Sequence, residues 1–428
     1  MSLIERLLKF LVIFFKSIKY DNYSFKGAFY HTANKMLKPE EYPVAYHLAI
    51  EALKNYGKVK LIKLKLCDFI DNDLIAEGLA SLILLIKNKK LLEEVNILLK
   101  NYGIPYNVNL ILSCSTKELN KMKMLDRVSY EYSLPIWFVN KVIRLLGYEE
   151  SLSLFKSYLE RDVVWLRVNT LKISIDKAIR HLESLGVYVE EDKDFPEVLG
   201  ISERYLRKVA LSSLVKNYEV FIQDKASIAA VYALDPHPDE VILDMCAAPG
   251  LKTTMIAQYM ENKGKIVAVD ISKRRVRELV KIIRKSNAKN VHVMIADSRL
   301  DNFKAHFDKA LLDAPCSSSG AISIDPSLRV RLERTNIPSL IRVQEELLLN
   351  AINLSEITVY CVCSILPEEG EKVIDYTLGK VKLLRLSNIP GTKGYPGYYC
   401  SPFVRRLFPH IHRTQGFFIA KLLKLEHA

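Results

Sequence analysis

Two cysteines follow short apolar stretches of the kind that form buried strands. Cys316 ends residues 313–316 (DAPC), and Cys363 lies within residues 361–364 (CVCS). A thiolate can add to an electron-poor carbon and so split one difficult reaction into two easier steps. A nearby cation lowers the pKa of such a thiol, and Lys252 is the candidate for that cation. The sequence predicts covalent catalysis by a cysteine, although chemistry alone does not choose between the two thiols.

The remaining cysteines are expected to be small packing residues, because a free cysteine is more often a buried apolar group than a catalyst. The chain has seven cysteines in all, scattered and without a CxxC pair. We therefore expect no metal site. These packing cysteines are Cys67, Cys114, Cys246, Cys361 and Cys400.

A loop of small residues follows the apolar stretch 241–243. Residues 244–252 have the sequence DMCAAPGLK. Small side chains let the backbone approach a ligand, and the amide groups that open the next helix point toward it. Gly250 stands alone, without the GxGxxG pattern that wraps a pyrophosphate. The loop therefore predicts a cofactor without phosphates, such as S-adenosylmethionine.

Two carboxylates follow successive predicted strands. Asp270 comes about 20 residues after Gly250, where a carboxylate can accept hydrogen bonds from both ribose hydroxyls. Asp297 follows the third strand, where it could accept a hydrogen bond from an adenine amino group. Both positions favour a nucleoside-containing cofactor beside the thiols.

Thiols next to such a cofactor predict a particular reaction. Carbon 5 of cytosine is a poor nucleophile while the ring is aromatic. When a thiolate adds to carbon 6, carbon 5 becomes nucleophilic enough to attack a sulfonium methyl group. A base then removes the proton from carbon 5, and the cysteine is eliminated. Methylation of an exocyclic amine would instead be expected to show a polar-Pro-Pro-aromatic loop where this chain has DAPC.

Alternating strands and helices must position these residues. Continuous apolar strands joined by helices are typical of a parallel sheet that is buried on both faces. We expect a Rossmann-like α/β sheet over residues 216–428, with ligands at the carboxyl ends of its strands. Its predicted strands are 241–243, 265–269, 291–295, 309–312 and 357–360, with helices at 252–260 and 273–284.

Two further domains are expected before this sheet. Residues 1–120 have helical spacing, because the apolar residues of 91–99 fall on one face of a helix. Residues 121–215 are expected to form a small α+β module. Its predicted elements are a strand at 163–169, a helix at 175–185 and a strand at 187–189.

The composition favours a polyanionic partner. The chain has 62 Lys and Arg against 49 Asp and Glu, a net charge of +13, and basic side chains that neutralise phosphates release counterions. The apolar stretches 7–15 and 80–86 are too short to span a membrane. Scattered thiols without a secretion signal are typical of reduced, cytoplasmic proteins. We expect a cytoplasmic monomer that binds nucleic acid and no membrane.

Three segments, 244–252, 313–316 and 361–364, together resemble the Sun-type (Nol1/Nop/Sun) RNA cytosine-5 methyltransferases. Residues 165–172 (WLRVNTLK) are similar to a segment of that family's small RNA-binding module, and the resemblance covers roughly residues 125 to 424. The helical region 1–120 is similar in position to the NusB-like RNA-binding domain of some bacterial members that methylate small-subunit ribosomal RNA.

The resemblance implies an rRNA or tRNA substrate, a 5-methylcytosine product and S-adenosylmethionine as methyl donor. It implies that Cys363 is the nucleophile, that Cys316 assists product release, and that Asp313 contacts the cytosine or the methionine moiety. The residues that would hold the cofactor are Cys246, Ala247, Ala248, Pro249, Gly250, Leu251, Lys252, Asp270, Arg275, Asp297 and Asp313.

The chain departs from the family pattern at a few positions. Leu251 replaces a glycine, Gln415 replaces an acidic residue, and Cys361 with Val362 replaces Ser-Thr, which adds a thiol that could be oxidised with Cys363. None of these changes removes a group that the reaction needs. Two alternatives stay open, a non-catalytic RNA-binding ribosome assembly factor that kept the fold, and a methyltransferase acting on DNA or a small molecule.

Overall fold

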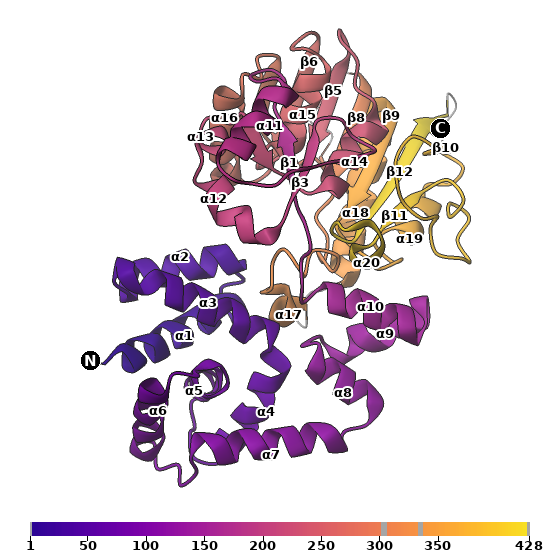
Figure 1. Ribbon diagram of the computed structural model, residues 1–428. Helices are drawn as coiled ribbons and strands as arrows, with labels where there is room; N and C mark the ends of the chain where they lie inside the picture. Colours follow the sequence, from indigo (N-terminus) through magenta and orange to yellow (C-terminus); the bar gives the residue numbers. More distant parts are fainter. Residues whose placement is uncertain (1, 301–305, 333–336, 426–428) are drawn as a thin grey trace. The chain divides into compact units, whose positions relative to one another are not determined.

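The computed structural model describes residues 2–300, 306–332 and 337–425. The chain divides into two compact units, whose elements are labelled in Figure 1. The first unit is Met1–Leu159 with Ile322–Thr335, and the second is Glu160–Ala321 with Asn336–Ala428. The domain boundaries expected near residues 120 and 215 stay a prediction.

The first unit is helical, which confirms the expectation of an all-helical N-terminal region. Several of its helices begin after a serine or asparagine whose side chain accepts a backbone N–H, which satisfies a donor that the helix leaves unpaired. The helices are α1 (Leu3–Lys19), α2 (Phe25–Met36), η1 (Pro39–Glu41), α3 (Tyr42–Lys54), α4 (Tyr56–Leu66), α5 (Asp73–Leu85), α6 (Lys89–Asn101), α7 (Val108–Lys121), α8 (Met124–Glu131), α9 (Ile136–Leu146), α10 (Tyr148–Ser157) and α17 (Leu328–Arg331).

A buried polar contact and a distant segment help to hold this unit together. The fully buried carboxylate of Glu77 accepts hydrogen bonds from Lys19 Nζ at 2.6 Å and from the Tyr56 hydroxyl. Helix α17 comes from residues that the sequence would assign to the large sheet. Its buried Arg329 donates to the carbonyl oxygen of Tyr158 at 2.8 Å. Residues 322–332 therefore pack with the helical unit.

A four-stranded antiparallel sheet opens the second unit. Its order is β2-β3-β1-β4, with strands β1 (Val164–Val168), β2 (Glu190–Glu191), β3 (Val198–Ile201) and β4 (Val220–Ile222). Helices α11 (Ile175–Ser184), η2 (Glu203–Tyr205), α12 (Leu206–Ala210) and α13 (Ser213–Lys216) accompany it. The predicted strand at 187–189 is wrong. The buried Val187 donates its N–H to the carbonyl oxygen of Leu182, so its backbone closes the end of α11 instead of pairing in the sheet.

The large sheet confirms the predicted Rossmann-like fold. Its order is β10-β12-β9-β8-β5-β6-β7, with β11 paired to β12. The five predicted strands are parallel to one another: β5 (Val241–Met245), β6 (Lys265–Asp270), β7 (Val291–Ile295), β8 (Phe307–Asp313) and β9 (Ser355–Val362). The sequence prediction did not include β10 (Val381–Leu384), β11 (Arg405–Leu407) and β12 (Phe417–Lys424), which form antiparallel pairs at one end of the sheet.

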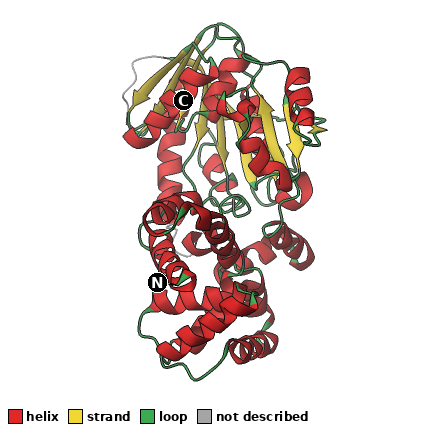
Figure 2. Ribbon diagram, turned by 60° about the vertical axis from the view of Figure 1, so that its left-hand side comes forward, coloured by secondary structure: helices red, strands yellow, loops and turns green. Residues whose placement is uncertain are grey.

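Helices cover the sheet on both faces, as Figure 2 shows with helices in red and strands in yellow. One apolar layer includes residues of α14 (Lys225–Leu234), α15 (Leu251–Tyr259) and α16 (Lys273–Ser286). The other includes residues of α18 (Ile337–Leu354) and α19 (Glu371–Asp375), while α20 (Pro409–His412) precedes β12. Because both faces are covered, the carboxyl ends of the parallel strands are the natural place for a ligand. Within the described ranges, every helix is too short or too polar to cross a membrane.

Candidate active site

The small-residue loop after β5 has the close packing that its sequence predicts. Gly250 adopts a φ of +108°, and a Cβ atom there would lie 2.5 Å from the side chain of Leu279 on α16. A residue with a side chain would therefore be strained and would clash. The loop also bonds to the next strand, because Ala247 donates its N–H to the carbonyl oxygen of Val269 at 2.9 Å.

Asp244 lies beneath this loop at the end of β5. Its side chain is 1% exposed, and burial raises its pKa to about 7. One carboxylate oxygen accepts a hydrogen bond from the Thr253 hydroxyl at 2.6 Å. The other, Oδ1, is buried without a hydrogen-bond partner among the described residues. A buried oxygen of this kind fits a site that receives a further donor, either from a ligand or from water.

Asp270 and Arg275 join the end of β6 to the same loop. Asp270 accepts the backbone N–H of Ala248 at 3.2 Å and of Ser272 at 2.9 Å, and it lies 3.5 Å from the Arg275 guanidinium. Arg275 also donates to the carbonyl oxygen of Ala248. The carboxylate predicted to meet a ribose is thus only 2% exposed and held in place by backbone donors.

Asp297 follows β7 and pairs with Arg299, a residue that the sequence reasoning missed. The guanidinium donates to the carboxylate at 2.6 Å, and this hydrogen bond lowers the pKa of Asp297. The close spacing of the two residues in the sequence was the available signal for this pair.

Lys252 reaches from the first turn of α15 to the end of β8. Its Nζ lies 2.6 Å from Asp313 and 3.4 Å from the Ser227 hydroxyl. Burial by itself would lower the pKa of Lys252, but the Asp313 carboxylate outweighs burial and raises the pKa above its usual value. Lys252 therefore stays a cation in this site.

The two predicted thiols meet at the carboxyl ends of β8 and β9. The Sγ atoms of Cys316 and Cys363 lie 3.4 Å apart, and the Ser318 hydroxyl lies 3.5 Å from Sγ of Cys363. Two backbone bonds join the loops, from Ala314 N–H to the Cys361 carbonyl oxygen and from Gly320 N–H to the Cys363 carbonyl oxygen, each at 3.0 Å. Sequence reasoning missed Ser318, although the run of serines after Cys316 was a signal.

The surroundings make these two thiols unequal. A hydrogen bond from Cys316 lowers the pKa of Cys363, and Ser318 and the Lys252 ammonium act in the same direction, against burial and the charge of Asp313. The same hydrogen bond, together with burial, raises the pKa of Cys316 well above its usual value. Cys363 is therefore the thiol of this pair that ionises first.

Two neighbouring cysteines have raised pKa values and so form a thiolate less readily. Cys361 is buried, its Sγ lies 3.6 Å from Asp313, and burial raises its pKa well above the usual value. Burial also raises the pKa of Cys246 to about 12. Both results agree with the packing role expected from sequence, while oxidation of Cys361 with Cys363 stays a prediction. The described residues contain no group of three or more His, Cys, Asp or Glu that could hold a metal ion.

The fold and this site define a member of a known family. Residues 231–423 match the family model described as 16S rRNA methyltransferase RsmB/F, and residues 134–205 match its ferredoxin-like domain. The chain belongs to the RsmB/F methyltransferase family, which confirms the resemblance to the Sun-type enzymes.

Curated relatives of this chain are named RNA cytosine-C5 methyltransferases. The tRNA (cytosine(72)-C(5))-methyltransferase of Pyrococcus horikoshii is 33% identical over 69% of this chain and 77% of its own length. The mouse 28S rRNA (cytosine-C(5))-methyltransferase is 33% identical over 71% of this chain. This chain spans 40% of the length of the mouse and human 28S rRNA relatives and 53% of the fission yeast 25S rRNA relative.

Solved structures have the same fold. The crystal structure of PH0851 is 28% identical, covers 99% of both chains and has a TM-score of 0.78. The structure of NSun6 from Pyrococcus horikoshii, with the S-adenosylmethionine analogue SFG, is 26% identical with a TM-score of 0.63 and covers 69% of this chain and 100% of its own.

Proposed function

We propose that this protein is an S-adenosylmethionine-dependent RNA methyltransferase that modifies carbon 5 of cytosine through a covalent adduct with Cys363. The observation that carries the proposal is the thiol pair. Sγ of Cys363 lies 3.4 Å from Sγ of Cys316, has the lower pKa of the two, and follows the end of β9, which pairs with β8. A pair of unequal thiols suits a reaction that needs one nucleophile and one group for release.

The residues around the loop fit S-adenosylmethionine, which supplies an electrophilic methyl group on a sulfonium sulfur. Gly250 adds no side chain to the loop. The buried Oδ1 of Asp244, which has no hydrogen-bond partner among the described residues, can accept a hydrogen bond. The residues proposed to hold the cofactor remain those predicted from sequence: 246–252, Asp270, Arg275, Asp297 and Asp313.

Cys363 acts first, by adding its thiolate to carbon 6 of the cytosine. The Lys252 ammonium favours the thiolate because an opposite charge nearby lowers a thiol pKa. Lys252 also donates a hydrogen bond to the Asp313 carboxylate at 2.6 Å, and this contact restricts the rotation of the Asp313 side chain at the end of β8. In the adduct, carbon 5 is nucleophilic and can accept the methyl group.

Cys316 is suited to the release step. Its pKa is raised mainly by the hydrogen bond with Cys363 and by burial, with the charge of Cys363 adding to the effect. When Cys363 becomes a neutral thioether, that charge is gone and the pKa of Cys316 falls. Cys316 can then release its own proton to water, and the resulting thiolate accepts the proton from carbon 5 as the bond from Cys363 to carbon 6 breaks.

RNA is the proposed substrate class. The net charge of +13 suits a polyanion, and the relatives named above act on rRNA or tRNA according to their names. A cytosine held in a duplex would have to leave the base stack to reach the thiol.

The direct test is methyl transfer from labelled S-adenosylmethionine to total RNA that lacks the modification, with bisulfite sequencing of the product. We expect 5-methylcytosine at a defined site with the native protein and none with Cys363→Ala. Cofactor binding by Cys363→Ala should be unchanged, because the loop proposed to hold the cofactor joins β5 to α15, whereas Cys363 follows β9. Cofactor binding without transfer by the native protein would instead favour the non-catalytic assembly factor.

A further inference from the structure

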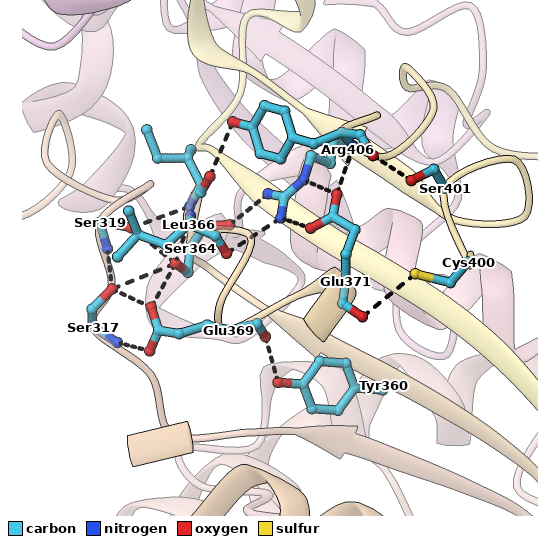
Figure 3. Close-up of polar contacts among 12 residues, drawn as sticks. Ser317, Ser319, Tyr360, Ser364, Leu366, Glu369, Glu371, Cys400, Ser401 and Arg406 are labelled. Atoms are coloured by element: carbon cyan, nitrogen blue, oxygen red, sulfur yellow. Dashed lines mark hydrogen bonds and ion pairs between the residues drawn. The ribbon is translucent and has the colours of Figure 1, made fainter. Parts of the chain in front are cut away.

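A buried carboxylate lies directly behind the two thiol loops. Glu369 is fully buried, and its Oε1 accepts the backbone N–H of Ser317 at 2.8 Å and Nε2 of Gln344 at 3.1 Å. Its Oε2 accepts the hydroxyls of Ser317 at 2.5 Å and Ser364 at 2.6 Å. Figure 3 shows the contacts from Ser317 and Ser364 converging on the Glu369 side chain. Four donors match the acceptor capacity of an ionised carboxylate.

The bonded serines are the immediate neighbours of the two thiols. Ser317 follows Cys316, and Ser364 follows Cys363. Gln344 also donates to the carbonyl oxygen of Pro315 at 2.9 Å, so the Cys316 loop is held on both sides of its thiol. One side chain thus connects the loops that follow β8 and β9.

The backbone around Glu369 is itself held firmly. The Tyr360 hydroxyl donates to the carbonyl oxygen of Glu369 at 2.7 Å. Two residues further along, the buried Glu371 pairs with the buried Arg406 at 2.7 Å. Arg406 donates to the carbonyl oxygens of Ser364 at 3.2 Å and Leu366 at 3.3 Å (Figure 3). Because the backbone at Glu369 and just before it is bonded to buried side chains, Glu369 can transmit a defined geometry to both loops.

We propose that Glu369 is a positioning residue that holds the thiols of Cys316 and Cys363 against each other and keeps Cys363 the reactive one. The role given to Cys363 rests on the proposed function, whereas the holding of the two loops does not. Without the contact from Ser317 or the contact from Ser364 to Glu369, one of the two thiol loops could shift. The hydrogen bond between the thiols would then weaken, because such a bond depends steeply on distance and angle.

The charge of Glu369 works in the same direction as its geometry. It contributes to the raised pKa of Cys316, after the hydrogen bond with Cys363, burial and the charge of Cys363. A negative charge that disfavours ionisation of Cys316 leaves the proton there and the thiolate on Cys363.

The test compares the alkylation rates of the two cysteines by iodoacetamide, read by mass spectrometry across a range of pH. One pKa unit between the thiols corresponds to about a tenfold difference in thiolate fraction, so we expect Cys363 to react at least about tenfold faster in the native protein. In Glu369→Gln, which keeps the shape but loses the charge, we expect this ratio to fall several-fold and Cys316 to be alkylated at lower pH.

A matched control separates positioning from stability. Glu77→Gln also neutralises a fully buried carboxylate, but that carboxylate lies in the helical unit, where it accepts hydrogen bonds from Lys19 and the Tyr56 hydroxyl. It should lower the melting temperature while keeping the alkylation ratio near that of the native protein. Ser364→Ala, a smaller change, serves if Glu369→Gln does not fold, and it should lower the ratio in the same direction.

The outcomes are distinct. An unchanged ratio and unchanged pH dependence in folded Glu369→Gln or Ser364→Ala would overturn the inference and leave Glu369 with a structural role. A native protein that transfers no methyl group would contradict the proposed function. The alkylation ratio would still test the inference in that case, because it needs neither RNA nor cofactor.

Discussion

The Nζ atom of Lys252 lies 2.6 Å from the carboxylate of Asp313 and links the first turn of α15 to the end of β8. The same ammonium lowers the pKa of Cys363. One cation therefore connects the cofactor loop with the strand ends that bear the thiols, and its removal should affect the reactivity of Cys363 from a distance.

We expect Lys252→Met to slow methyl transfer at neutral pH, with the pH–rate profile moved toward alkaline pH. Without the cation the thiolate is less favoured, so a higher pH is needed to form it. The profile is measured with labelled S-adenosylmethionine. Lys263→Met, a change at an exposed lysine just after α15, is the control. A profile that keeps its midpoint in Lys252→Met would contradict this role.

Cys316→Ala should accumulate a covalent complex with RNA that survives denaturant. The nucleophile Cys363 can still add to cytosine, but the group that accepts the proton from carbon 5 is missing. A gel under denaturing conditions would reveal the complex as a slower band containing both RNA and protein. The double variant Cys316→Ala with Cys363→Ala should show no such band, and rapid turnover without any adduct by the single variant would rule out a release role.

Asp270→Asn should weaken S-adenosylmethionine binding about 10- to 100-fold, because hydrogen bonds to a charged acceptor are worth about 1.5–3 kcal/mol. Isothermal titration calorimetry measures this change without RNA. Asp308→Asn provides a comparison, since Asp308 accepts a backbone N–H from Val241 at the opposite end of the parallel strands. Equal losses in the two variants would argue against a specific contact between Asp270 and the cofactor.

Asp244→Asn should change how stability depends on pH. The pKa of Asp244 is raised to about 7 in the folded protein, against about 3.9 in an unfolded chain. Between these values the folded state holds a proton that the unfolded state has released, so this group lowers the free energy of unfolding as pH rises. A shift of about three units corresponds to roughly 4 kcal/mol at most.

Asparagine stays neutral at every pH, so the variant should lose this contribution to the slope. Urea unfolding near pH 5 and near pH 8 measures this pH dependence. From pH 5 to pH 8 the free energy of unfolding of Asp244→Asn should rise relative to that of the native protein. A difference between the proteins that is the same at both pH values would show that Asp244 is ionised in the fold.

Much of the site could be predicted because its signals are local. Each parallel strand is a short apolar stretch, and the residues predicted for the site lie at or just after the strand ends, as Asp270 ends β6 and Asp313 ends β8. Parallel strands with helical connections bring their carboxyl ends to one edge. That rule alone placed Cys316 and Cys363 near each other, and the structure has their sulfurs 3.4 Å apart.

Other features depend on contacts between segments that are far apart in the chain. Strands β10, β11 and β12 pair antiparallel, and neither their composition nor their spacing indicated which neighbours they would have. Residues 322–332 come from the sheet half of the sequence yet pack with the helical unit, because Arg329 meets backbone oxygens there.

The sequence by itself determined the class of fold, the loop of small residues after β5 and the presence of two thiols at one sheet edge, since each depends on residue type and periodicity within a short stretch. Only the tertiary structure decided which thiol has the lower pKa, because that order comes first from the hydrogen bond between Cys316 and Cys363, to which Ser318 and Lys252 add. It also brought Glu369 within 2.8 Å of Ser317, 52 positions away. A contact across such a separation depends on how the whole sheet packs, and no local pattern encodes it.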